Sequence, residues 1–127
     1  MLKIIISIGL GSFLGGISRF LLSRAVQSTF ITHIPIGTLI VNILGCFLIG
    51  ILYSLFEVGI ISNNHTRMFL TVGFCGGFTT FSTFSHENLM LLQDGNFFLF
   101  SIYTFLSLFL GLLATLIGHY LTKIIIT

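Results

Sequence analysis

Apolar residues fall into four long runs along the chain, and short polar segments separate them. The runs cover about residues 2–22, 36–56, 68–92 and 97–121. A helix that crosses the hydrocarbon of a bilayer needs about 20 mostly apolar residues, and each run is that long. The pattern therefore predicts an all-α, multi-pass membrane protein whose four transmembrane helices form a single domain over residues 1–127.

The connecting segments support these boundaries because they hold most of the remaining polar residues. Residues 23–35 and 57–67 are polar links, and Gln93–Asn96 is a short run of turn-forming residues. The first run follows Lys3, as the apolar core of a signal peptide would. It is long enough to span, however, and three further runs follow it, so we expect a membrane helix there.

The composition excludes several classes of protein. Hydrophobic residues make up 55% of the chain and charged residues only 6%, whereas about a quarter of the residues of a soluble domain are charged. A water-soluble enzyme is therefore excluded, and so is a nucleic-acid partner, which would require a clustered basic surface. Cys46 and Cys75 lie inside apolar runs without the spacing of a zinc site, so we interpret them as small buried hydrophobes.

The basic residues give almost no preference for one orientation in the membrane. With four spans, Lys3, Arg67 and Lys123 belong to the side of the termini, and Arg19 and Arg24 belong to the other. Either this balance is uninformative in so short a chain, or the protein inserts in both orientations and pairs antiparallel with itself. Four helices are also few for a pathway through a membrane, which favours a homodimer with the route at the subunit boundary.

Polar residues follow one face of the second run and one face of the fourth. Thr38, Asn42 and Gly45 recur at helical spacing in the second run, and Tyr103 and Ser107 do so in the fourth. Such residues in hydrocarbon either pack helices together or line a cavity. The Asn42 carboxamide offers N–H donors that could bind an anion without adding a charge. Both interpretations remain open from the pattern alone.

The third run contains an unusual segment. Adjacent glycines followed by two β-branched threonines form a poor helix, so we predict a break near Gly76–Thr80, close to the middle of the membrane. Non-helical backbone at that depth must be buried in protein or face a cavity. The carbonyl oxygens that a break frees suit a hard cation such as sodium. Alternatively, Gly73 and Gly77 form a GxxxG packing face.

Aromatic rings follow the predicted break. Phe81 and Phe84 are three residues apart and share a helix face. Their ring edges carry partial positive charge and could attract a small anion, although each ring could equally belong to the core or face lipid. A cation at the same place would hold the anion too tightly for conduction. Arg19, near the end of the first run, could either extend to the interface or draw anions into a vestibule.

Three segments together resemble the Fluc family of fluoride channels, also called the CrcB family. They are Gly15–Phe20, Pro35–Gly45 and Gly73–Phe84, and their order, the chain length and the number of spans match as well. The resemblance implies an antiparallel, dual-topology homodimer in the cell (inner) membrane. It also implies two fluoride pores and one structural sodium ion at the dimer centre.

The resemblance also implies roles for individual residues. Those implied to line the anion pore are Asn42, Phe81, Phe84, Tyr103 and Ser107, with Thr38 on the same stripe as Asn42. Arg19 matches the vestibule arginine, and Gly76 and Thr79 match the positions whose backbone carbonyls hold sodium. Gly111 stands where some relatives have a hydroxyl residue, so it is open whether the row of polar residues on the fourth helix continues through that position.

The implied activity is passive export of fluoride, which enters cells as the uncharged acid and is trapped after it dissociates. The main alternative is a proton-coupled exporter of the small multidrug-resistance type, also a four-helix dimer. It would need a titratable carboxylate inside the membrane, whereas Glu57, Glu87 and Asp94 fall toward predicted helix ends or loops. An accessory assembly subunit without transport activity would not need the polar faces of the second and fourth runs. A membrane enzyme is not expected, because no catalytic set falls at one depth.

Overall fold

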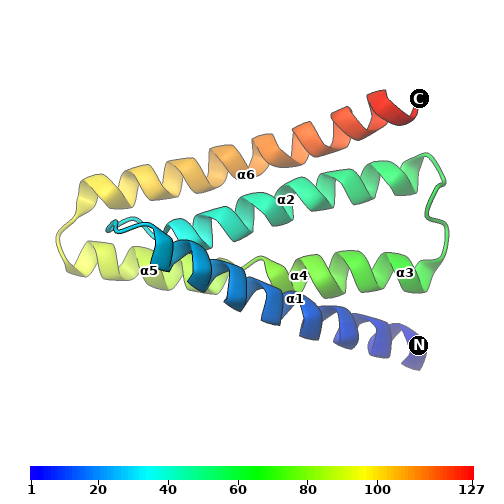
Figure 1. Ribbon diagram of the computed structural model, residues 1–127, viewed down its shortest axis with the longest axis horizontal. Helices are drawn as coiled ribbons and strands as arrows, with labels where there is room; N and C mark the ends of the chain where they lie inside the picture. The colour runs from blue at the N-terminus through cyan, green and yellow to red at the C-terminus, as the bar shows by residue number, and fades with distance from the viewer.

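The computed structural model describes all residues, 1–127, and it is helical throughout, as the sequence predicts (Figure 1). In chain order the elements are α1 (Leu2–Thr29), α2 (Ile36–Glu57), α3 (Asn64–Met68), the π-helix η1 (Phe69–Cys75), α4 (Gly76–Phe78), α5 (Phe81–Gln93) and α6 (Phe97–Ile126). Both chain ends lie at the same end of the bundle as the loop between α2 and α3.

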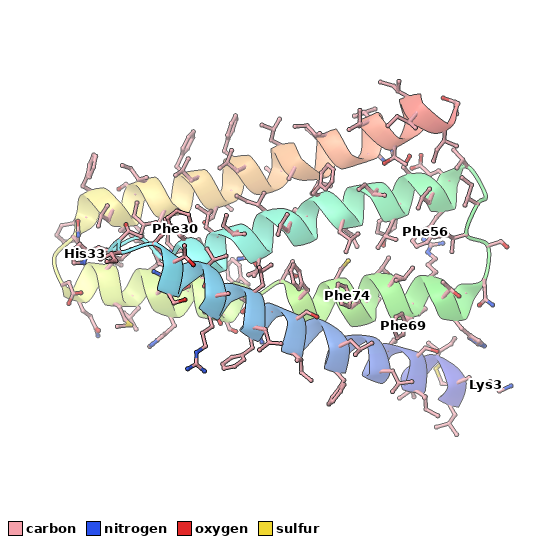
Figure 2. All side chains as sticks on the ribbon, in the orientation of Figure 1. Lys3, Phe30, His33, Phe56, Phe69 and Phe74 are labelled. Atoms are coloured by element: carbon pink, nitrogen blue, oxygen red, sulfur yellow. The ribbon has the colours of Figure 1, made fainter.

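Three of the helices, α1, α2 and α6, are long and apolar enough to cross a membrane. Two of them extend beyond their apolar runs: α1 continues to Thr29 instead of ending near residue 22, and α6 continues to Ile126 instead of ending near residue 121. Side chains project outward along α1 and α6 (Figure 2). The exposed apolar residues of these helices include Phe13, Phe105 and Leu112. These outward faces are suited to lipid.

The connection between α5 and α6 is the tight turn that the sequence predicts. Gly95 has a φ of 73°, a left-handed conformation that favours glycine. The Asn96 side chain then accepts a hydrogen bond from the Leu99 N–H at 3.3 Å, which caps the start of α6. This turn makes α5 and α6 antiparallel neighbours.

Glycines bring the helix backbones into direct contact. A Cβ added to Gly15 of α1 would collide with the Phe74 carbonyl oxygen and lie 3.0 Å from the Phe78 nitrogen. A Cβ on Gly77 would lie 2.7 Å from the Ser12 oxygen. The packing interpretation of the Gly73/Gly77 pattern is therefore confirmed, and it holds together with the break.

The break itself is confirmed, and it is narrower than predicted. Thr79 and Thr80 are extended, with φ/ψ of −90°/158° and −149°/122°. Gly76–Phe78, which we expected to be part of the break, stays helical as α4. Glycine weakens a helix by only about 1 kcal/mol per residue, an amount that packing against α1 overcomes. The π-helix Phe69–Cys75 precedes α4 and was not predicted.

Candidate functional site

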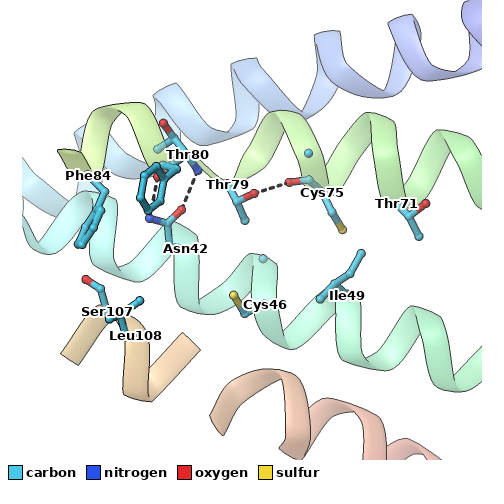
Figure 3. A pocket seen from close by; sticks show the side chains of 13 residues that line it. Asn42, Cys46, Ile49, Thr71, Cys75, Thr79, Thr80, Phe84, Ser107 and Leu108 are labelled. Carbon is cyan, nitrogen blue, oxygen red and sulfur yellow. Dashed lines mark hydrogen bonds between the residues drawn. The ribbon is translucent and has the colours of Figure 1, made fainter. Parts of the chain in front are cut away.

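A cavity of about 400 Å³ lies beside the break (Figure 3). Side chains and backbone from α2, η1, α4, α5 and α6 surround it: Asn42, Gly45, Cys46, Ile49, Thr71, Cys75, Gly76, Thr79, Thr80, Phe81, Phe84, Ser107 and Leu108. None of these residues carries a formal charge. The cavity brings together six of the nine residues for which the sequence predicts a role in the pore, the vestibule or the sodium site: Asn42, Gly76, Thr79, Phe81, Phe84 and Ser107.

Asn42 holds the non-helical backbone at the break. Its Oδ1 accepts a hydrogen bond from the Thr80 N–H at 2.8 Å, and its Nδ2 donates to the Thr80 carbonyl at 3.1 Å. A carboxamide has two N–H donors, so one N–H of Asn42 remains for a ligand. The structure thus confirms that Asn42 bonds across to a neighbouring helical segment, and its role in anion binding stays a prediction.

The first turn of α5, which begins at the cavity-lining residue Phe81, has N–H groups without partners. The Thr80 side chain caps this turn by accepting a hydrogen bond from the Thr83 N–H at 3.2 Å. The N–H groups of Phe81 and Ser82 have no partner within the chain. Unpaired N–H groups at a helix start carry partial positive charge. This end of the break is thus favourable for an anion.

The other end of the break presents carbonyl oxygens. In an unbroken helix these oxygens would accept hydrogen bonds from the N–H groups four residues later, but no backbone N–H of α5 reaches Gly76, Gly77 or Thr79. Arg19 Nε donates to the Gly77 oxygen at 3.1 Å. The carbonyls of Gly76 and Thr79 remain without a partner, and both residues line the cavity. Unwound carbonyls of this kind coordinate sodium in membrane proteins.

The two phenylalanines of α5 differ sharply in their exposure. Their ring centroids are 5.6 Å apart with planes inclined by 44°. Phe84 is buried, with 9% of its surface exposed, and Phe81 is 74% exposed. Both residues line the cavity, so Phe84 contributes a buried part of its wall and Phe81 a largely exposed part.

The hydroxyls of α6 have different environments. The Ser107 Oγ is buried and has no hydrogen-bond partner, and Ser107 lines the cavity. Tyr103 is fully enclosed: its ring lies 5.2 Å from Phe84, and its hydroxyl donates to Glu87 Oε1 at 3.1 Å. Only Ser107 of this pair is therefore placed on the cavity.

A second cavity, of about 290 Å³, contains Thr38 and Glu87. Thr38 does not line the first cavity, although it shares a helix face with Asn42. Glu87 lies within α5 and points into the bundle, rather than toward a helix end as we expected from the sequence. Its spacing of three residues from Phe84 was the signal that could have placed it on the inner face.

Comparisons with known proteins identify the family. The family model described as CrcB-like protein, Camphor Resistance (CrcB), matches residues 6–119. This chain belongs to the CrcB family. The match covers every residue that lines the cavity, and it agrees with the resemblance that three sequence segments indicate.

Several relatives in the CrcB family carry the name fluoride-specific ion channel FluC. The relative from Bacteroides fragilis is 47% identical over 123 residues, 94% of this chain and 96% of its own length. That from Phocaeicola vulgatus is 43% identical over 122 residues, 96% of this chain and all of its own length. That from Campylobacter jejuni is 42% identical over 123 residues, 97% of this chain.

Proposed function

We propose that this chain forms a fluoride-selective channel that lets fluoride leave the cell passively, down its electrochemical gradient. The observation that carries the proposal is the uncharged cavity at the break, where Phe84, Ser107 and the free N–H of Asn42 meet. The names of its CrcB relatives support the choice of ion. Such a protein is a channel and not an enzyme.

The cavity suits a small anion for physical reasons. Fluoride gives up a strong hydration shell when it enters a narrow pore, so the pore must supply donors in its place. The buried Ser107 hydroxyl, the Asn42 amide and the ring edges of the phenylalanines supply partial positive charge. Because no lining residue is a cation, the ion can leave again.

A second copy of the chain would complete the cavity. The extended residues Thr79 and Thr80 line this cavity together with Phe81, which is 74% exposed. Irregular backbone at membrane depth is stable only where protein or a water-filled cavity covers it. We therefore propose a homodimer with this face at its centre. The near balance of basic residues is compatible with the antiparallel, dual-topology arrangement that the family resemblance implies.

In this arrangement each chain contributes four spans to one domain. Three are α1, α2 and α6, and the fourth is the broken helix from Asn64 to Gln93. The protein would be multi-pass in the cell (inner) membrane. Subunit counting by photobleaching in lipid checks the assembly. We expect two subunits per particle, and a monomer in lipid would contradict the homodimer.

The residues present fit a structural sodium ion at the dimer centre. The Gly76 and Thr79 carbonyls are without partners and line the same cavity, so two copies would supply four oxygens. Sodium would hold the two broken helices together there by neutralising their carbonyl ends. We expect replacement of sodium by N-methylglucamine to weaken the dimer. Unchanged subunit counts without sodium would contradict the site.

Tyr103, Thr38 and Arg19 remain predicted members of the pathway. Tyr103 and Thr38 lie beyond Phe84, around Glu87, where the second cavity continues toward the α5–α6 end. Arg19 is the predicted vestibule residue. The ions would thus pass from the first cavity, along the buried face of α5, to the second.

Glu87 is the one observation that favours the alternative, a proton-coupled exporter. It places a carboxylate within α5, bonded to Tyr103. Such an exporter would move an organic cation against its gradient when a pH gradient is applied. A fluoride channel would not transport an organic cation, whether or not a pH gradient is applied.

Ion-specific efflux from liposomes tests the proposed function directly. Purified protein reconstituted at low density should release fluoride from vesicles within seconds, while chloride release stays at the level of protein-free vesicles. Equal chloride and fluoride efflux would contradict the selectivity. Absence of efflux for both ions would contradict the channel itself.

A further inference from the structure

Arg19 makes a contact that its expected role does not explain. Its Nε donates a hydrogen bond of 3.1 Å to the Gly77 carbonyl, 58 residues along the chain, in the last turn before the break. The packing of the helices makes this reach possible. A Cβ on Gly77 would lie 3.1 Å from the Gly16 nitrogen, so α1 and α4 touch through their backbones. Arg19 is three residues beyond Gly16, on the same face of α1.

The acceptor is one of the groups that the break leaves without a partner. In a continuous helix the Gly77 carbonyl would accept the N–H of Phe81, but the extended Thr79 and Thr80 separate the two. The helical backbone is continuous from Asn64 to Phe78, and its carbonyl end carries partial negative charge. A guanidinium donor is well matched to that end, because hydrogen bonds to charged groups are the stronger ones.

The break is thereby held from two sides. Asn42 of α2 binds the N–H and the carbonyl of Thr80, and Arg19 of α1 binds the carbonyl of Gly77. Thr79 lies between these two anchored residues. We propose that Arg19 is a positioning residue: its hydrogen bond to Gly77 fixes the α1 side of the break and so sets the direction of the Thr79 carbonyl and the start of α5.

The expected role of Arg19, attraction of anions by its charge, makes a different prediction. Arg24 is a matched control because it lies on the same helix, near the same end, and carries the same charge. Its guanidinium lies 5.9 Å from the centroid of the Phe20 ring, and it makes no hydrogen bond to the break, unlike Arg19. Neither arginine has a carboxylate within ion-pair distance, since both ion pairs of the chain involve Glu57. A charge effect would therefore be similar for the two arginines, and a positioning effect would be specific to Arg19.

Hydrogen exchange of the peptide that contains residues 77–85, measured in lipid nanodiscs without fluoride, tests the proposal. We expect Arg19→Gln to speed amide exchange there by about tenfold or more, because a hydrogen bond to a charged donor is lost, and Arg24→Gln to leave it unchanged. Equal exchange in Arg19→Gln and the unmodified protein would overturn the proposal. So would equal acceleration in both variants.

Fluoride efflux at low and high ionic strength gives a second measurement, and only this part rests on the proposed function. Positioning predicts a loss of flux in Arg19→Gln that added salt does not change, whereas a charge effect would disappear as salt screens it.

If Arg19→Gln does not fold, Arg19→Lys replaces it, because the charge stays and the planar donor is lost. Faster amide exchange of residues 77–85 in Arg19→Lys supports the positioning role. Amide exchange and fluoride efflux that both stay unchanged in this variant overturn it. Faster exchange in a protein that conducts no fluoride would contradict the channel but not the role of Arg19.

Discussion

The side chain of Asn42 closes a pair of hydrogen bonds with the backbone of Thr80, 38 residues further along the chain. This pairing replaces the helical hydrogen bonds that Thr80 would otherwise make. The break is therefore a specified structure with its own partners. It creates, within one short stretch, free N–H groups on one side and free carbonyls on the other.

Asn42→Ala should weaken both the fold and the flux. It leaves the N–H and the carbonyl of the half-buried Thr80 without partners, and an unpaired group costs up to about 1–3 kcal/mol when water cannot reach it. We expect a lower midpoint of thermal unfolding in detergent and a fluoride efflux reduced by about tenfold or more. Ser101→Ala is the control, because Ser101 is exposed and its hydroxyl bonds only to Phe97 of its own helix. Normal efflux from Asn42→Ala would place the route elsewhere.

Phe81→Ile should reduce fluoride flux while leaving the stability of the single chain almost unchanged. The Phe81 ring is 74% exposed, so little packing within the chain is lost. Its aromatic edge disappears, however, and with it an electropositive contact for the anion. Phe105→Ile is a matched control on the outward face of α6, where the ring is 62% exposed. The measurement is fluoride efflux from liposomes that hold equal amounts of each variant. Equal efflux rates for Phe81→Ile and Phe105→Ile would show that Phe81 is not part of the pathway.

Ser107→Ala should separate binding of the anion from folding. The Ser107 Oγ is buried without a partner, so its removal breaks no hydrogen bond within the chain and relieves an unpaired polar group. We expect an unchanged or slightly higher unfolding midpoint together with a severalfold loss of fluoride efflux. A variant that loses neither stability nor efflux would show that this hydroxyl does not meet the ion.

Gly15→Ala should destabilise the protein, and Gly9→Ala should not. A Cβ at Gly15 would collide with the Phe74 carbonyl and force α1 away from η1, which costs about 1–3 kcal/mol. Nothing lies within 4 Å of a Cβ at Gly9, so alanine there should stabilise α1 slightly through its higher helix propensity. Thermal unfolding of the two variants side by side measures the difference. Equal midpoints would contradict the close contact of α1 and η1.

Local propensity made the break predictable but not its extent. Two threonines after adjacent glycines are poor helix formers, and the structure does leave the helix at Thr79 and Thr80. The glycines were expected to unwind as well, yet both stay helical, and the backbone of Gly77 packs directly against α1. The π-helix Phe69–Cys75 has no comparable signal in the sequence.

Periodicity placed the site residues on helix faces but could not decide which of them meet. Asn42 and Thr38 share a face of α2, and the structure assigns them to different cavities. Phe81 and Phe84 share a face of α5, and their exposed fractions differ widely because only Phe84 packs against Tyr103. These outcomes depend on the angle at which neighbouring helices cross.

The sequence by itself determined the four apolar runs, the place of the break and the turn at Gly95, because each depends on residues close together in the chain. Only the tertiary structure decided which side chain would satisfy each group freed by the break. Asn42 and Arg19 are distant in sequence from Thr80 and Gly77. They reach the break because glycine contacts and helix packing bring α1 and α2 against it, and no local pattern encodes that approach.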